Sequence, residues 1–188
     1  MENKTYAPDY LIVVNKKHPL DPKFLETIEL VPAPNTEGED LQAEKTTYAA
    51  YCELRDWLEK EKGVRIGLDS AYRSIESQER IIREFTEMYG EEYAYTYAAI
   101  PGTSEHHTGL ALDIVPWLEN KFLVMNEDMF AHPELFPEIH KALPDFGFIL
   151  RFPGRENGVY EPWHIRYVGK EAAKEITEKG LILEEYVK

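Results

Sequence analysis

Residues 104–113 read Ser-Glu-His-His-Thr-Gly-Leu-Ala-Leu-Asp, a stretch that combines polar residues with an alternating apolar pattern. The alternation in its second half predicts a strand over 109–115 whose leucines face a core. Gly109, Ala111 and Asp113 share the opposite face, so a carboxylate stands behind two residues that are too small to obstruct it. Such a face leaves space for a ligand, although a Gly-containing edge strand with a solvated aspartate fits the stretch equally well.

A second informative stretch, residues 160–167, reads Tyr-Glu-Pro-Trp-His-Ile-Arg-Tyr. Pro162 disfavours helix at Glu161 and so holds that residue extended. Alternation along the following strand places His164 and Arg166 on one face. A buried tryptophan flanked by polar residues at a strand edge would have the same pattern, and spacing alone favours that simpler interpretation.

Together the two stretches contain the residue types of a metal site. Two histidines and one aspartate, His106, Asp113 and His164, suffice for zinc with one coordination position left open. Glu161 is available beside them as a general base.

A third stretch, Ser-Ala-Tyr-Arg-Ser at 70–74, lies at a predicted strand-to-helix turn and is followed by Gln78. Backbone N–H groups at such a turn favour anions, and the guanidinium of Arg73 can grip a carboxylate with two hydrogen bonds. A capping turn with a solvent-facing arginine is the alternative interpretation.

The remaining pattern predicts a single α+β domain over residues 1–188, with helices packed on a small, mostly antiparallel sheet that carries the zinc site. Four prolines limit residues 116–146 to short helices, and residues 91–100 fit either a strand or an aromatic-rich loop. The predicted strands are 10–15, 64–68, 109–115, 148–152 and 163–168; the predicted helices are 41–62, 74–90 and 170–179, the last within a C-terminal helical segment, 170–188.

Composition excludes several classes of function. Twenty-one basic against 35 acidic residues give a formal charge of −14, which would repel a nucleic-acid backbone. Cys52 is the one cysteine, so the chain has neither an internal disulfide nor a thiolate metal cluster, and we expect this thiol to pack as a small hydrophobe.

The apolar runs are too short for a membrane span, and the chain opens without the basic and apolar regions of a secretory leader. We therefore expect a cytoplasmic protein, or an extracytoplasmic one if a leader was trimmed.

The three stretches, in this order and with this spacing, resemble the VanY/VanX-type zinc D,D-peptidases. That family's pattern has a Tyr-Arg-Ser turn, then Ser-x-His-x-x-Gly-x-Ala-x-Asp, then Glu-x-Trp-His. The chain matches these motifs at 72–74, 104–113 and 161–164, and VNKKHPL at 14–20 and FGFILRFP at 146–153 also resemble the family. The resemblance covers about residues 10–169.

Carried over by position, the resemblance implies that His106, Asp113 and His164 bind Zn²⁺ and that Glu161 is the catalytic base. Arg73 would bind the substrate or stabilise the oxyanion. The expected substrate-binding residues are Ser104, Gln78, Tyr72 and Trp163.

Two positions depart from the family pattern. His107 stands where glutamine is more frequent, and Ala71 replaces a frequent glycine. His107 could compete for zinc, but neighbouring residues on an extended segment point apart, so we keep His106 as the ligand. His18, His132 and His140 lie outside the motifs and are expected at the surface.

The implied activity is hydrolysis of D-Ala-D-Ala termini, either in a peptidoglycan precursor peptide or in the free dipeptide, by a zinc D,D-carboxypeptidase or dipeptidase. Two alternatives stay open. Relatives with a similar pattern act as L,D-carboxypeptidases or endopeptidases on muropeptides. The bond is selected by the walls of the pocket, which we expect within residues 116–146. A non-catalytic peptidoglycan-binding module is the alternative from another class.

Overall fold

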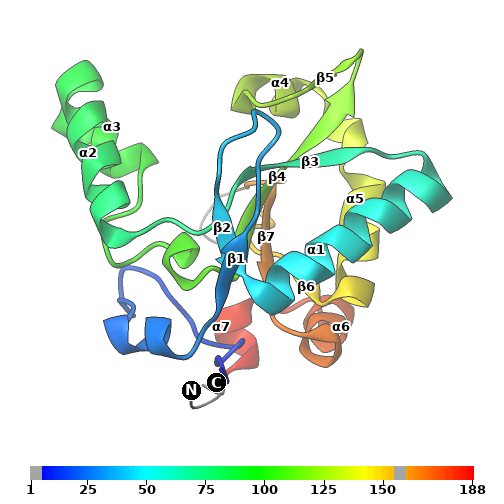
Figure 1. Cartoon of the computed structure of the whole chain (residues 1–188), viewed down its shortest axis with the longest axis horizontal. Helices are drawn as coiled ribbons and strands as arrows, with labels where there is room; N and C mark the ends of the chain where they lie inside the picture. Colours follow the sequence, from blue (N-terminus) through cyan, green and yellow to red (C-terminus); the bar gives the residue numbers. More distant parts are fainter. Residues whose placement is uncertain (1–5, 155–159) are drawn as a thin grey trace.

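The computed structural model describes residues 6–154 and 160–188, and it confirms the predicted α+β class (Figure 1). Four antiparallel strands form the central sheet in the order β3 (Ile66–Ser70), β4 (Ala111–Leu118), β7 (His164–Tyr167), β6 (Phe148–Leu150). A short strand, β5 (Lys121–Phe122), extends β4 as a hairpin, and β1 (Leu30–Pro32) pairs with β2 (Gln42–Glu44) in a separate ribbon.

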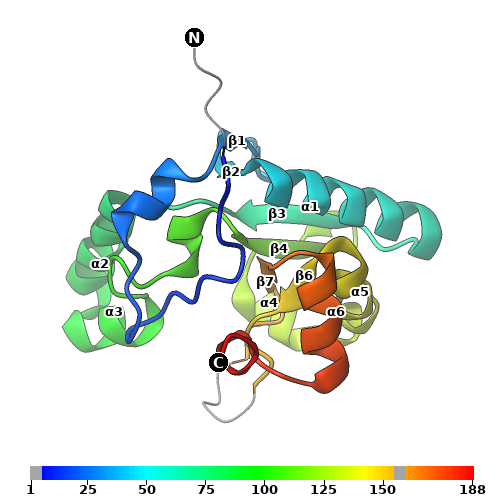
Figure 2. The ribbon, with the colours of Figure 1, turned by 90° about the horizontal axis from the view of Figure 1, so that it is seen from below.

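The helices gather in two places (Figures 1 and 2). The first group stands to one side of the sheet, and the other helices, the second group, lie on or beside the sheet. The first group is α2 (Ile75–Tyr89) and α3 (Glu91–Tyr97); the second is α1 (Lys45–Trp57), α4 (Asn126–Ala131), α5 (Pro137–Ala142), α6 (Lys170–Lys179) and α7 (Leu183–Tyr186). In these described residues no helix is both long and apolar enough to cross a membrane.

One face of the sheet is the main core. Leu112 and Ile114 on β4 and Ile165 on β7 pack with Leu54 of α1 and Ile139 of α5. All five side chains are completely buried, which contributes roughly 1.5–3 kcal/mol per side chain relative to exposure. Because side chains alternate along a strand, the other face of β4 and β7 is left for polar groups.

The first predicted strand, 10–15, is wrong. In the structure this segment is irregular, and Asn15 forms only an isolated bridge with His18. Its backbone carbonyls are used instead by a side chain, because Arg166 donates to the carbonyls of Tyr10 and Ile12 at 3.1 and 2.9 Å. The apolar composition of this segment is that of a strand, but among the described residues the segment has no neighbouring strand to pair with. Its apolar residues pack on other elements instead.

One helix begins later than the sequence predicts. The helix expected over 41–62 begins at Lys45, because residues 42–44 pair in β2 and the Glu44 carboxylate caps the helix by accepting from the Thr47 N–H at 2.8 Å. Its last turn, Leu58–Lys62, is π-helical and ends at Gly63, as expected. Residues 91–97, which the sequence left open, form helix α3.

Candidate active site

Three elements bring the predicted metal ligands together on the polar face of the sheet. Asp113 on β4 and His164 on β7 are direct cross-strand partners. His106 comes from a single 3₁₀ turn, Glu105–Thr108 (η3), which precedes β4. In the described part of the chain, these three residues are the one group of His, Cys, Asp or Glu side chains whose ligand atoms all lie within 4.8 Å of one another.

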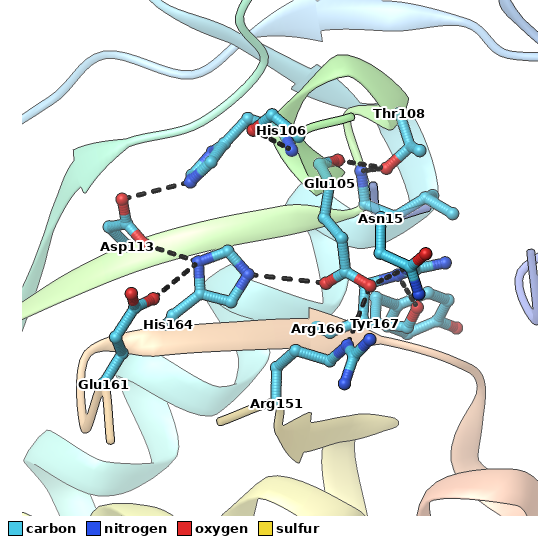
Figure 3. Close-up of polar contacts among 12 residues, drawn as sticks. Asn15, Glu105, His106, Thr108, Asp113, Arg151, Glu161, His164, Arg166 and Tyr167 are labelled. Carbon is cyan, nitrogen blue, oxygen red and sulfur yellow. Dashed lines mark hydrogen bonds and ion pairs between the residues drawn. The ribbon is translucent and has the colours of Figure 1, made fainter. Parts of the chain in front are cut away.

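Hydrogen bonds fix which ring nitrogens face the centre of this group (Figure 3). His106 Nδ1–H donates to the carbonyl of Ala71 at 2.7 Å, and its Nε2 lies 3.1 Å from Asp113 Oδ2. His164 uses the opposite nitrogens: Nε2 lies 3.4 Å from Glu105 Oε2, and Nδ1 lies 3.0 Å from Asp113 Oδ1. Two imidazole nitrogens and a carboxylate, each ring anchored through its other nitrogen, fit a zinc ion with an open fourth position.

The charges of this group are strongly coupled. Burial disfavours the ionised carboxylate of Asp113, but His106 and His164 outweigh burial and hold the pKa of Asp113 well below its usual range. Burial likewise opposes the charged form of His164, but hydrogen bonds to Asp113 and Glu105 raise the pKa of His164 to about 9. The two carboxylates therefore favour a protonated, cationic His164 at the place where a metal cation is expected.

Glu161 lies at the edge of this group, one turn before β7. Its Oε2 is 4.0 Å from His164 Nδ1, and its side chain is half-buried. Burial and the charge of Asp113 raise the pKa of the Glu161 carboxyl despite the opposing effect of His164. A partly exposed carboxylate with a raised pKa beside a metal site is suited to accept and return a proton.

Arg73 reaches the site from the turn between β3 and α2. Its backbone N–H donates to the His106 carbonyl at 3.1 Å, which ties this turn to η3. Its guanidinium donates to Gln78 Oε1 at 2.9 Å and to Ser70 Oγ at 3.1 Å. The side chain lines a hollow of about 440 Å³ that Asp69, Tyr72 and Ser77 also line. The guanidinium therefore borders this hollow.

The other expected substrate contacts have different surroundings. Gln78 is fully buried, and its amide nitrogen donates to the Ala99 carbonyl at 2.9 Å, so it lies behind Arg73 and holds that guanidinium. Ser104 is buried and caps η3, accepting from the His106 N–H. Tyr72 lines the hollow, whereas Trp163 is in the core with its ring edge-to-face against the exposed Phe130.

Two histidines outside the proposed ligand set are held by the backbone. We expected His107 on an extended segment, but it lies on η3. Its Nδ1–H donates to the Arg73 carbonyl at 2.6 Å, and its Nε2 accepts from the Gly102 N–H at 3.0 Å. Both nitrogens are therefore engaged away from the ligand group. The prediction that His140 lies at the surface is wrong: it is half-buried, and its Nε2–H donates to the Pro162 carbonyl at 2.8 Å.

Sequence reasoning missed a buried set of charged residues beside His164. Glu105 accepts from Arg151 Nε at 2.8 Å and from Arg166 at 2.9 Å. One signal was present: Arg166 was expected on the same strand face as His164. A guanidinium on a buried face requires a carboxylate partner. Only the fold shows that the partner is Glu105, 61 positions earlier in the chain.

Comparisons with known proteins agree with these motifs. The chain is 38% identical over 131 residues to the putative carboxypeptidase YodJ of Bacillus subtilis (strain 168), covering 68% of this chain and 47% of YodJ. It is 33% identical to a D-alanyl-D-alanine carboxypeptidase of Enterococcus faecalis, covering 94% of this chain and 65% of the relative. A bifunctional D-Ala-D-Ala dipeptidase and carboxypeptidase of Enterococcus gallinarum, VanXYC, is 34% identical, covering 94% and 92%. The chain thus spans under two thirds of the first two relatives.

Solved structures share the whole fold. A variant of the vancomycin-resistance D,D-pentapeptidase VanY in complex with Zn(II) superposes with a TM-score of 0.76 at 32% identity, covering 95% of this chain and 99% of that one. The LD-carboxypeptidase LdcB gives 0.78 at 32% identity, covering 95% and 85%. VanYB in complex with D-alanine-D-alanine gives 0.75 at 32%, covering 95% and 97%.

The match to a family model covers the elements that build the site. The model described as "VanY: D-alanyl-D-alanine carboxypeptidase" matches residues 40–170, a span that includes β3, η3, β4 and β7. Three of these elements carry the proposed ligands, and the turn after β3 carries Arg73. With its motifs, its fold and this match in agreement, the chain belongs to the VanY family of D-alanyl-D-alanine carboxypeptidases.

Proposed function

We propose that this protein is a zinc-dependent D,D-carboxypeptidase that hydrolyses the D-Ala-D-Ala ends of peptidoglycan precursor peptides, or the free dipeptide. The observation that carries the proposal is the convergence of His106, Asp113 and His164, with Glu161 at their edge. The names of the relatives support the substrate, because they include a D,D-carboxypeptidase and a D-Ala-D-Ala dipeptidase. A zinc ion in a related structure supports the metal.

Each chain residue has a distinct task in this proposal. When bound, zinc supplies a Lewis acid that lowers the pKa of water from about 15.7 toward about 7 and polarises a carbonyl. Glu161 takes the proton of the attacking water and passes it to the leaving amine. Arg73 provides positive charge for the substrate carboxylate or for the oxyanion that develops on the scissile carbonyl. Gln78 and Ser70 hold the guanidinium of Arg73 in place.

Cleavage of an L,D bond is the second candidate. The structural similarity to LdcB, an LD-carboxypeptidase, is as close as the similarity to VanY. Ligand and base positions do not distinguish the two activities, because the walls around the substrate select the bond. Phe130 on α4 belongs to the region expected to form a wall, and its ring lies against Trp163, next to His164.

One experiment separates these candidates. The purified protein is incubated with three substrates: a pentapeptide stem ending in D-Ala-D-Ala, the free dipeptide D-Ala-D-Ala, and a tetrapeptide stem whose last bond is L,D. Products are identified by mass spectrometry, with and without a zinc chelator. We expect chelator-sensitive loss of one D-Ala from the pentapeptide. Cleavage of the tetrapeptide alone would favour the L,D activity. Binding without cleavage of any substrate would indicate the non-catalytic module.

A cytoplasmic location stays a prediction, with an extracytoplasmic one as the alternative. Fractionation of cells that produce the natural protein would test this location.

A further inference from the structure

Behind the proposed ligands lies a cluster of four charged side chains, of which three are buried and are labelled in Figure 3. Its members are Glu105, Arg151, Arg166 and Glu184. Arg151 bridges the two carboxylates, with Nε 2.8 Å from Glu105 Oε1 and an amino group 2.5 Å from Glu184 Oε1. Two guanidiniums and two carboxylates sum to zero charge, so the cluster can remain buried.

The cluster is anchored from several parts of the chain. Asn15, in the VNKKHPL segment, donates to Glu184 at 3.1 Å. Arg166 is completely buried and also donates to the carbonyls of Tyr10 and Ile12. The N-terminal segment, β7 and Arg151, which directly follows β6, therefore all contribute to the position of one carboxylate, that of Glu105.

The two oxygens of Glu105 have separate partners. Oε1 accepts from both arginines, at 2.8 and 2.9 Å. Oε2 is left to face His164 Nε2 at 3.4 Å. Burial alone would raise the pKa of Glu105, but the guanidiniums of Arg151 and Arg166 outweigh it and keep the carboxyl ionised.

A carboxylate at this place determines how His164 can bind a cation. A neutral imidazole carries one N–H, and the acceptor at Nε2 retains that proton there. Nδ1 then has its lone pair directed toward Asp113, where the proposed metal would lie. Hydrogen bonding of the distal nitrogen to a carboxylate also raises the basicity of the coordinating one.

Resting on the proposed function, we infer that Glu105 is a positioning residue that orients His164 for the metal, and that Arg151 and Arg166 hold its carboxylate in place. The same short turn then serves two ligands. His106 supplies a nitrogen directly, whereas the neighbouring Glu105 reaches around β4 to the far side of His164. Ser104 and Thr108 fix this turn, since Thr108 Oγ1–H donates to the Glu105 carbonyl at 2.6 Å.

The test measures zinc affinity by chelator competition and, separately, thermal stability. In Glu105→Gln an amide must serve both sides: if its oxygen faces His164, its NH₂ faces the arginines, and the reverse leaves His164 without an acceptor. We expect zinc affinity to fall about 10- to 100-fold. Glu184→Gln is the matched control, because it removes the same charge from the same cluster but has no contact with His164. It should lower Tm and leave zinc affinity close to that of the unmodified protein.

Two charge-balanced double variants keep the test decisive if a single variant does not fold. Glu105→Gln with Arg151→Gln, and Glu184→Gln with Arg151→Gln, each leave one guanidinium and one carboxylate. We expect weak zinc binding in the first pair only. Equal zinc affinity in the two pairs, or unmodified affinity in Glu105→Gln, would overturn the inference and give the cluster a purely structural role. If the unmodified protein itself binds no zinc, the proposed function fails instead.

Discussion

Asp113 and His164 face each other across neighbouring strands, with Asp113 Oδ1 3.0 Å from His164 Nδ1. On the other side of β4, the partner of Asp113 is Ser70, which holds Arg73. Strand β4 therefore places the carboxylate of Asp113 between His164, on one neighbouring strand, and the turn that carries Arg73, after the other. The following predictions test these roles one at a time.

The first prediction concerns the metal. If His106, Asp113 and His164 bind zinc, the purified protein carries about one zinc per chain, and His164→Ala loses both metal and activity. Metal content is measured by elemental analysis after gel filtration. His132→Ala is the control, because His132 is outside the group and pairs with Glu134. Full zinc occupancy in His164→Ala would remove it from the ligand set.

The second prediction separates the base from the ligands. Glu161→Gln keeps the size of the side chain but cannot accept a proton, so kcat falls by on the order of 100-fold or more while zinc is retained. Turnover and metal content are measured on the same preparation. Unchanged turnover would exclude Glu161 as the base, and loss of zinc would make it a ligand.

The third prediction concerns the substrate carboxylate. A lysine ammonium cannot reproduce a two-pronged guanidinium grip, so Arg73→Lys should lower kcat/KM by roughly 10-fold or more. Amidating the C-terminus of the substrate should cost the unmodified enzyme far more than it costs Arg73→Ala, because that variant has already lost the interaction. Equal losses would show that Arg73 acts on the oxyanion or on the fold.

The fourth prediction follows from the proton on His164. Its pKa of about 9 in the metal-free protein lies above the ordinary 6.5, so between these values this imidazole binds a proton that zinc must displace. Apparent zinc affinity should therefore rise with pH by about tenfold per unit for this one proton, and level off above about pH 9. Chelator competition across this range measures the slope, and a flat profile would contradict the raised pKa.

The fifth prediction concerns His140, which holds the Pro162 carbonyl one residue after the proposed base. His140→Ala removes a half-buried hydrogen bond, so we expect a loss of about 1 kcal/mol in the free energy of unfolding and a several-fold lower kcat with zinc retained. His140→Gln keeps a donor and should recover part of the rate. A change in Tm without any change in kcat would limit His140 to a structural role.

The alternation of side chains along a strand was sufficient to predict which residues of the site share a strand face. His164 and Arg166 were expected on one strand face, and both reach Glu105 from that face in the structure. The register that sets Asp113 opposite His164 could not be read, because it depends on pairing between segments 51 positions apart. The irregular segment 10–15 failed for a related reason: its apolar residues pack on distant elements, and its carbonyls bind a distant guanidinium.

The contacts of Arg166 with the carbonyls of Tyr10 and Ile12 limit how far the protein can be shortened. The family match begins at residue 40, which suggests a minimal catalytic unit that starts there. Such a truncation would remove two acceptors from a completely buried guanidinium and would take Asn15 away from Glu184. We therefore expect a chain shortened past residues 10–15 to fold less stably, and an expression tag is better attached before them than in their place.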